Sequence, residues 1–225
     1  MTWSLPPAIF AIGKNYAEHA KEMGGTPPDK PTVFMKNPAS VISNGDDIVI
    51  PSICLEPHAQ TDYEGELAVI IGRDTRDVKE ADALDCISGY AVANDVTARW
   101  WQKQGSGGQW VRGKSFDTFC PLSEPVPAAA NIAPQDLTIK TRVNGATVQD
   151  DSTKNMIFSV ATLIATLSTG LTLLEGTVIL TGTPAGVGHA KSPPSYLENG
   201  DVVEIEIEQI GLLRNTVRSA ASVNN

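Results

Sequence analysis

The stretch of residues 61–72 constrains the fold of this chain more than any other segment. An apolar run over residues 67–71, closed by Gly72, predicts a β-strand. Side chains two residues apart lie on the same side of a strand, so Glu64 and Glu66 should project together where the strand turns apolar. Neighbouring carboxylates repel each other unless a proton or a cation lies between them. Oxygen ligands of this kind suit a hard cation such as Mg²⁺, Mn²⁺ or Ca²⁺.

A second Glu-x-Glu segment in the chain provides an internal comparison. Residues 203–208 alternate between apolar and acidic side chains, which is typical of a half-buried strand with its glutamates in water. Glu64 and Glu66 instead lead into an unbroken apolar run, which indicates a strand buried on both faces. On the residues alone, two interpretations stay open for this pair: a solvated strand face and a metal site.

Length, charge and cysteine content limit the class of protein. The 225 residues are enough for one domain, so we expect residues 1–225 to form a single catalytic unit. The net charge of −9 argues against a nucleic-acid partner and against an anionic membrane surface. No apolar stretch approaches the ~20 residues of a transmembrane helix. We see no secretory signal, and three widely spaced cysteines without a C-x-x-C pair favour a cytoplasmic location.

Residues 14–25 predict a short polar helix with the features of a mobile lid. Asn15 can act as its N-cap and Gly24 can end it, next to a proline-rich segment. On such a helix His19 and Glu22 are three residues apart and face each other. A carboxylate that orients an imidazole is a general-base arrangement. The alternative is an ordinary exposed pair on a surface helix.

Two further polar residues are candidates for the same site. Asp95 ends a predicted strand over residues 87–95, where it is either a turn or cap residue or a third metal ligand. Lys114 lies in a predicted loop over residues 110–118, where it is either a solvated lysine or a site residue. Local sequence alone does not choose between these alternatives.

The remaining patterns set the fold class. Asn144-Gly145 predicts a hairpin turn. A helix with Ser152 or Thr153 as its cap is predicted from a spaced apolar stripe, namely Met156, Val160, Leu163, Ile164 and Leu167. Many short strands and few helices predict a β-rich α+β fold. The chain lacks G-x-G-x-x-G between a strand and a helix, so a dinucleotide-binding domain is not expected.

Six motifs in a fixed order resemble the fumarylacetoacetate hydrolase family over nearly the whole chain. They are Gly13-Lys14-Asn15-Tyr16 with His19 and Glu22, Tyr63-Glu64-Gly65-Glu66-Leu67, and residues 94–99, 113–117, 143–145 and 181–188. One such motif would be weak evidence, but six in order over about 180 residues make chance an unattractive explanation.

The resemblance implies a fold, a metal and a set of site residues. The fold would be a roll of stacked mixed β-sheets, usually a homodimer. The metal would be Mg²⁺, sometimes Mn²⁺ or Ca²⁺, on Glu64, Glu66 and Asp95. The catalytic residues that match the family are His19, Glu22 and Lys114. The positions that match its substrate pocket are Arg99, Gln102 and Thr183.

The resemblance also limits the activity. Long fumarylacetoacetases carry an extra N-terminal domain and a fourth metal carboxylate ahead of the glutamate pair, and we see neither here. The short branch contains acylpyruvases, fumarylpyruvate hydrolases, oxaloacetate decarboxylases and 2-hydroxyhepta-2,4-diene-1,7-dioate isomerases. Relatives often have an acidic–aliphatic pair where this chain has Trp100-Trp101. Because of this difference, the resemblance does not determine which substrate the pocket selects.

We therefore expect a Mg-dependent hydrolase that cleaves a C–C bond in a 2,4-dioxo acid through a metal-bound pyruvate enolate. The alternative is an isomerase or decarboxylase in aromatic catabolism, acting on a 2-hydroxydienedioate or on oxaloacetate. A non-catalytic metal-binding domain is the alternative from another class. The presence of His19, Glu22 and Lys114 argues against that last alternative.

Overall fold

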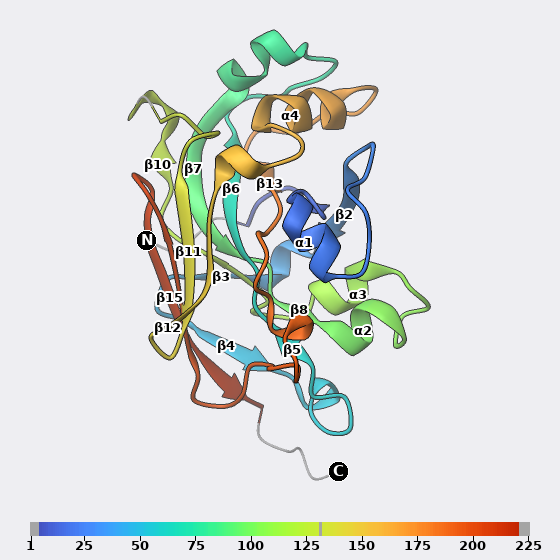
Figure 1. Cartoon of the computed structure of the whole chain (residues 1–225). Coiled ribbons are helices and arrows are strands. Elements are labelled where there is room, and N and C mark those ends of the chain that lie inside the picture. The colour runs from blue at the N-terminus through green and yellow to red at the C-terminus, as the bar shows by residue number, and fades with distance from the viewer. Residues whose placement is uncertain (1–4, 131, 221–225) are drawn as a thin grey trace.

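A computed structural model describes residues 5–130 and 132–220 of the chain (Figure 1). Residues 1–4 and 221–225 lie outside the described part. The predictions of a single unit over residues 1–225 and of no secretory signal both include these residues. The largest sheet contains β1 (Ile9–Gly13), β2 (Thr32–Lys36), β3 (Val41–Ser43), β6 (Gly65–Ile71), β7 (Ile87–Asn94), β9 (Cys120–Leu122), β10 (Val126–Pro127) and β13 (Val178–Leu180).

Two smaller sheets and a few helices complete the described chain. The second sheet contains β4 (Asp47–Ile50), β11 (Thr138–Val143), β12 (Ala146–Ser152), β14 (Val202–Ile207) and β15 (Gly211–Ser219), and β5 (Thr61–Asp62) pairs with β8 (Thr97–Ala98). The α-helices are α1 (Ala17–Glu22), α2 (Arg99–Lys103), α3 (Trp110–Lys114) and α4 (Val160–Ser168). Parallel and antiparallel pairs occur together in both larger sheets. The prediction of a β-rich α+β fold of mixed sheets is confirmed.

The largest sheet is curled into a roll, because a short connection joins the strands at its two edges. The strand order is β2-β1-β13-β6-β7-β9-β3, so β2 and β3 form opposite edges. A flat sheet would separate these edges by roughly 29 Å. Only one 3₁₀ turn, Pro38–Ser40, links the end of β2 to the start of β3, and so short a link reaches ~18 Å at most. The sheet therefore curls until its edges approach each other.

Small apolar side chains fill the inside of this roll. They belong to Ile9, Ala11, Ala68, Ile70, Ala91, Ala93, Cys120, Leu122, Val178 and Leu180. Alanine is frequent because a tightly curved sheet leaves little room on its concave side. The other face of the sheet packs against the second sheet and α4. Figure 1 shows the second sheet on one side of β6 and β7, and α1, α2 and α3 on the other.

The two Glu-x-Glu segments differ in the predicted way. Every residue of β6 is buried, so the strand after Glu64 is covered on both faces. In β14 the side chains of Val203, Ile205 and Ile207 are buried, whereas Glu206 is exposed and Glu204 half-buried. The hairpin at Asn144-Gly145 is also confirmed, since both residues have positive φ (52° and 79°), as a type I′ turn requires.

Three local predictions need correction, the first being the predicted loop over residues 110–118, whose residues Trp110–Lys114 form the helix α3. The predicted helix from Thr153 begins later, at Val160 with Ser159 as its N-cap, and residues Thr153–Asn155 form a separate 3₁₀ turn. Its apolar stripe is nevertheless core, as expected. Asn15 does not cap α1, because Tyr16 occupies the cap position. The Asn15 side chain instead donates to the carbonyls of Phe158 and Thr181 and accepts from the Phe158 N–H. Among the described residues, no helix has both the length and the apolar character needed to cross a membrane.

Gly113 sets the distance between α2 and α3, and we predict that it tolerates no side chain. A Cβ at this position would lie 2.3 Å from the backbone nitrogen of Gln102. We expect Gly113→Ala to destabilise the fold by ~1–3 kcal/mol, because the two helices must separate. Thermal unfolding measures this. Gly107→Ala, which meets no neighbour, is the control and should cost only about 1 kcal/mol for its positive φ. Equal losses in the two variants would contradict the packing argument.

Candidate active site and metal centre

Three carboxylates converge at one end of the rolled sheet. Glu66 lies at the start of β6 and Asp95 directly after β7, and the antiparallel register pairs Gly65 with Asn94. The Asp95 N–H donates to the Glu64 carbonyl at 2.8 Å, which holds the two segments together. Ligand atoms from Glu64, Glu66 and Asp95 all lie within 4.8 Å of one another, and all three residues are buried. The structure thus brings together the three residues that the sequence predicts as metal ligands.

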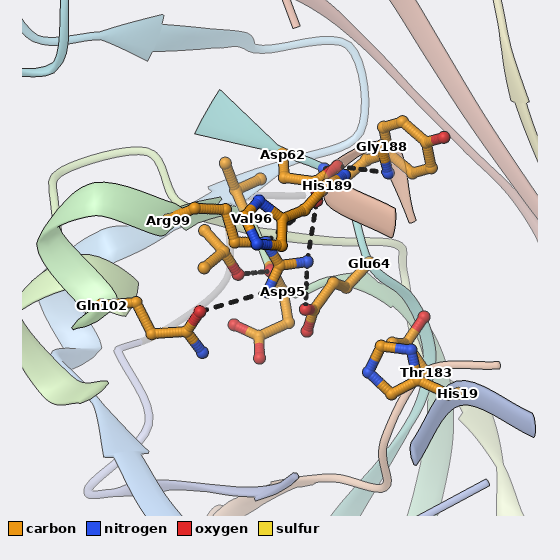
Figure 2. Close-up of polar contacts among 12 residues, drawn as sticks. His19, Asp62, Glu64, Asp95, Val96, Arg99, Gln102, Thr183, Gly188 and His189 are labelled. Atoms are coloured by element: carbon orange, nitrogen blue, oxygen red, sulfur yellow. Dashed lines mark hydrogen bonds and ion pairs between the residues drawn. The ribbon is translucent and has the colours of Figure 1, made fainter. Parts of the chain in front are cut away.

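Cationic side chains contact two of these carboxylates. Lys114 Nζ donates to Glu64 at 2.7 Å and to Asp95 at 2.6 Å. Arg99 lies 2.7 Å from the second oxygen of Glu64, between Glu64 and Asp62 (Figure 2). Burial raises the pKa of Glu64, but Lys114 and Arg99 outweigh burial and hold that pKa at about 2. Glu64 is therefore a carboxylate at any physiological pH.

Glu66 is in the opposite electrostatic situation. Burial raises its pKa well above the ordinary value, and the neighbouring Asp95 and Glu64 raise it further. The Gly182 N–H donates to its Oε2 at 2.7 Å. Within the described structure no cationic side chain forms an ion pair with Glu66, so its ionised form has no counter-ion from the protein. This is the expected property of a ligand whose counter-ion is a bound metal.

The charge balance of the whole cluster fits a divalent cation. Four buried carboxylates meet three buried cationic side chains, the fourth carboxylate being Asp62 and the cations being Lys36, Arg99 and Lys114. One negative charge is left over in a low-dielectric site. All three atoms of the triad that face one another are carboxylate oxygens, the ligands that Mg²⁺, Mn²⁺ and Ca²⁺ prefer.

The raised pKa of Glu66 predicts how the metal-free protein responds to pH. Stabilisation by the Glu66 proton is complete below the ordinary carboxyl pKa and is lost as the pH rises through the raised value. Glu66→Gln keeps the shape and removes the charge. In EDTA we expect it to melt above the wild type at alkaline pH, by roughly 2–4 °C per kcal/mol gained. The difference should shrink as the pH falls, and a lower melting temperature at every pH would contradict the assignment.

His19 and Glu22 form the predicted pair. His19 Nδ1 lies 2.7 Å from Glu22 Oε1, and Glu22 Oε2 accepts from the Gly186 N–H at 2.9 Å. His19 is only 5% exposed, which excludes the alternative of an exposed surface pair. Because the carboxylate occupies Nδ1, the free base position of a neutral imidazole is Nε2. Figure 2 shows His19 beside Thr183 and next to Glu64.

A cavity of about 140 Å³ joins Glu64 and Glu66 to most of the other predicted residues, with Asp95 and Glu22 behind its wall. The predicted residues on its wall are His19, Glu64, Glu66, Arg99, Gln102, Lys114 and Thr183. Gln102 uses its side-chain oxygen to accept from Arg99, so its amide N–H groups remain free to donate to a ligand. Thr183 donates its hydroxyl proton to the Gly65 carbonyl and accepts from Gln149, so it shapes the wall and offers no proton.

Sequence reasoning missed two buried charged residues of the site. Lys36 ends β2 and donates to Asp95 Oδ1 at 2.6 Å, to the Val96 carbonyl and to the Lys114 carbonyl. The sequence pattern that could have identified Lys36 is strand alternation. Lys36 lies two residues after Phe34, so its side chain is on the same, less exposed side of β2. Asp62 accepts from Arg99 at 2.8 and 2.9 Å and from the N–H groups of Gly188 and His189. A fourth carboxylate thus does lie ahead of the glutamate pair, but Asp62 binds Arg99 and is outside the triad.

The Trp100-Trp101 pair lies away from the cavity wall. Trp100 stacks on His58 with ring centroids 3.6 Å apart, and Trp101 packs edge-on against Phe116. The tryptophan that does line the cavity is Trp110, on α3. Trp100 and Trp101 therefore pack α2 against its neighbours, and a ligand in this cavity would not contact them directly.

Comparison with known proteins agrees with this geometry. The profile of the family described as "Fumarylacetoacetate (FAA) hydrolase C-terminal" matches residues 8–218. The chain belongs to the fumarylacetoacetate hydrolase family. It is 44% identical over 213 residues to "Oxaloacetate tautomerase fahd2, mitochondrial" of Xenopus laevis, covering 94% of this chain and 66% of that protein. The human "Oxaloacetate tautomerase FAHD2A, mitochondrial" is 42% identical over 214 residues, covering 94% and 67%.

Solved structures of family members have the same fold. A 5-carboxymethyl-2-hydroxymuconate delta-isomerase from Mycobacterium smegmatis matches with a TM-score of 0.84 at 39% identity, covering 97% of this chain and 81% of that one. A fumarylacetoacetate hydrolase from Exiguobacterium antarcticum matches with a TM-score of 0.85 at 45% identity, covering 96% and 76%. Members of the family are enzymes of hydrolase, isomerase and tautomerase types, and they bind a divalent metal.

Proposed function

We propose that this chain is a metal-dependent enzyme that acts on a small 2-oxo or 2-enol acid through a pyruvate-type enolate. The observation that carries the proposal is that His19, which pairs with Glu22, lines the same cavity as Glu64 and Glu66 of the carboxylate triad. Glu64, Glu66 and Asp95 would hold the metal, Mg²⁺ being our first choice. When bound, a divalent metal supplies a Lewis acid that stabilises negative charge on the enolate oxygen.

The wall residues suit the polar head of such an acid. Lys114 has three ammonium protons and uses two on Glu64 and Asp95, so one remains for a substrate oxygen. Gln102 offers its amide N–H groups. These donors are fixed in place before substrate arrives, because each is held by a buried partner. Fixed donors of this kind stabilise oxyanion charge without reorganisation.

In the hydrolytic reaction, His19 Nε2 takes a proton from water while Glu22 supports the imidazolium. The hydroxide attacks the distal carbonyl of a 2,4-dioxo acid. The C–C bond then breaks, its electron pair forms the pyruvate enolate, and the enolate carbon takes back a proton. Movement of α1 as a lid would exclude bulk water during these steps, and this role stays a prediction.

Isomerase or tautomerase activity is the second candidate, and the names of similar proteins favour it. The Xenopus laevis and human relatives are both named as oxaloacetate tautomerases, and one structural neighbour is named as an isomerase. The same base would then move a proton between carbon and oxygen without attack by water. The homodimer and the cytoplasmic location expected from the sequence stay predictions.

The test is turnover of a substrate panel with Mg²⁺ and with EDTA. The panel contains acetylpyruvate, fumarylpyruvate, oxaloacetate and a 2-hydroxydienedioate. Mg-dependent cleavage of the first two would support the hydrolase, and turnover confined to the last two would support the isomerase, tautomerase or decarboxylase. Absence of Mg-dependent turnover across the panel, with Mg²⁺ shown to bind, would contradict the proposed substrate class.

A further inference from the structure

Two lysines on the cavity wall have no carboxylate partner in the described chain. The buried cations Lys36, Arg99 and Lys114 are all ion-paired. Lys14 and Lys103 line the same cavity, and neither lies in an ion pair with a described residue. In a chain of net charge −9, two unneutralised cations beside one cavity are a specific feature.

Lys103 is held in place by a neutral acceptor. Its Nζ lies 2.8 Å from His189 Nε2, and His189 Nδ1 lies 2.8 Å from the Tyr196 hydroxyl. Burial lowers the pKa of His189, and Lys103 and Arg99 lower it further, so the imidazole is neutral and accepts the ammonium proton. The backbone N–H of His189 donates to Asp62 at 2.9 Å. Lys103 is thus oriented while its positive charge stays available.

Lys14 approaches from another part of the fold. It follows β1 with a φ of 58°, a left-handed conformation that is uncommon for a residue with a side chain. Such strained backbone concentrates at binding sites, where the surrounding structure holds it. Burial lowers the pKa of Lys103, and the positive charges of Arg99 and Lys14, which line the same cavity, lower it further.

We propose that Lys103, oriented by His189 and assisted by Lys14, binds the second carboxylate of a dicarboxylic 2-oxo or 2-enol acid. The inference rests on the proposed function, because it assumes that the 2-oxo acid head occupies the carboxylate triad end of the cavity. An anionic tail would offset the repulsion between the two lysines. A neutral acyl tail would leave both charges without a partner. The enzyme therefore selects a dioate over a monocarboxylic acylpyruvate.

The test compares two ligands that differ only at the tail. Full-length enzyme with Mg²⁺ is titrated with 2-oxoglutarate and with 2-oxopentanoate in a calorimeter. We expect the dicarboxylate to bind roughly 10- to 100-fold more tightly, as a charge-assisted contact predicts. Lys103→Gln should remove most of this preference and leave the affinity for 2-oxopentanoate unchanged. Lys14→Gln should remove a smaller part of it.

The controls separate this inference from the proposed function. Lys140→Gln removes a half-buried lysine of β11 that pairs with Asp150, and should leave both affinities unchanged. Equal affinity of the wild type for the two ligands, or an equal loss of both in Lys103→Gln, would overturn the role of Lys103. Failure of both ligands to bind the wild type would instead overturn the 2-oxo acid head and with it the proposed function.

Discussion

Glu66→Ala is expected to abolish both metal binding and turnover. The variant removes a ligand from the triad whose atoms lie within 4.8 Å of one another, and alanine offers no replacement oxygen. In the wild type, Mg²⁺ at 100 times its Kd should add about 2.7 kcal/mol of stability, which raises the melting temperature by roughly 5–10 °C. The variant should lose this increase. Its turnover should fall by roughly three orders of magnitude, because several kcal/mol of charge stabilisation disappear.

The matched control comes from the chain's other Glu-x-Glu strand. Glu206→Ala removes an exposed carboxylate of β14 that pairs with Arg142 at 3.0 Å. Surface ion pairs contribute ~0–1 kcal/mol, so this variant should keep the Mg-induced increase and normal turnover. An unchanged Mg-induced increase in Glu66→Ala would remove Glu66 from the ligand set.

His19→Ala is expected to separate metal binding from chemistry. His19 lies on the cavity wall but outside the carboxylate triad, so the Mg-induced increase in melting temperature should persist. Turnover should fall ~10²–10⁴-fold, the usual contribution of a positioned general base. Glu22→Gln should lose less, because the new amide keeps an oxygen beside Nδ1 but no longer supports the imidazolium.

His58→Ala is the control for loss of an imidazole. His58 stacks on Trp100 and is not among the residues that line the cavity, so its removal should leave turnover within a few-fold of the wild type. Undiminished turnover in His19→Ala would contradict the assignment of the base. Loss of the Mg-induced increase in the same variant would show that His19 affects the metal site directly.

The convergence of the three carboxylates was predictable because it depends on short-range rules. Strand alternation places Glu64 and Glu66 together, and the end of the neighbouring strand supplies Asp95. The His19–Glu22 contact likewise follows from helical spacing. Local rules left the solvated and the metal-binding interpretations open, and the family resemblance favoured the second. The burial of all three carboxylates excludes a solvated strand face. The fold class followed from the number and length of the apolar segments.

The residues that escaped prediction depend on long-range closure. Lys36 reaches Asp95, 59 positions away, only because the largest sheet curls and brings its edge strand over the end of the roll. The Asn15 side chain donates hydrogen bonds to two carbonyl groups more than 140 residues away. These long-range hydrogen bonds outweigh its local preference for the N-cap position of a helix. The helix after Thr153 starts late for a similar reason, since Met156 pairs with Tyr16 in an isolated bridge. Helix and strand periodicity in the sequence does not predict these long-range contacts.

The most direct test of enolate formation at this site is exchange of the C3 hydrogens of pyruvate in D₂O, followed by NMR. We expect exchange by the wild-type enzyme with Mg²⁺, because the proposed reaction forms a pyruvate enolate between the triad and His19. The exchange should disappear in EDTA, in Glu66→Ala and in His19→Ala, and persist in Glu206→Ala. Exchange by the wild type that is no faster than in buffer with Mg²⁺ would contradict an enolate formed at this site.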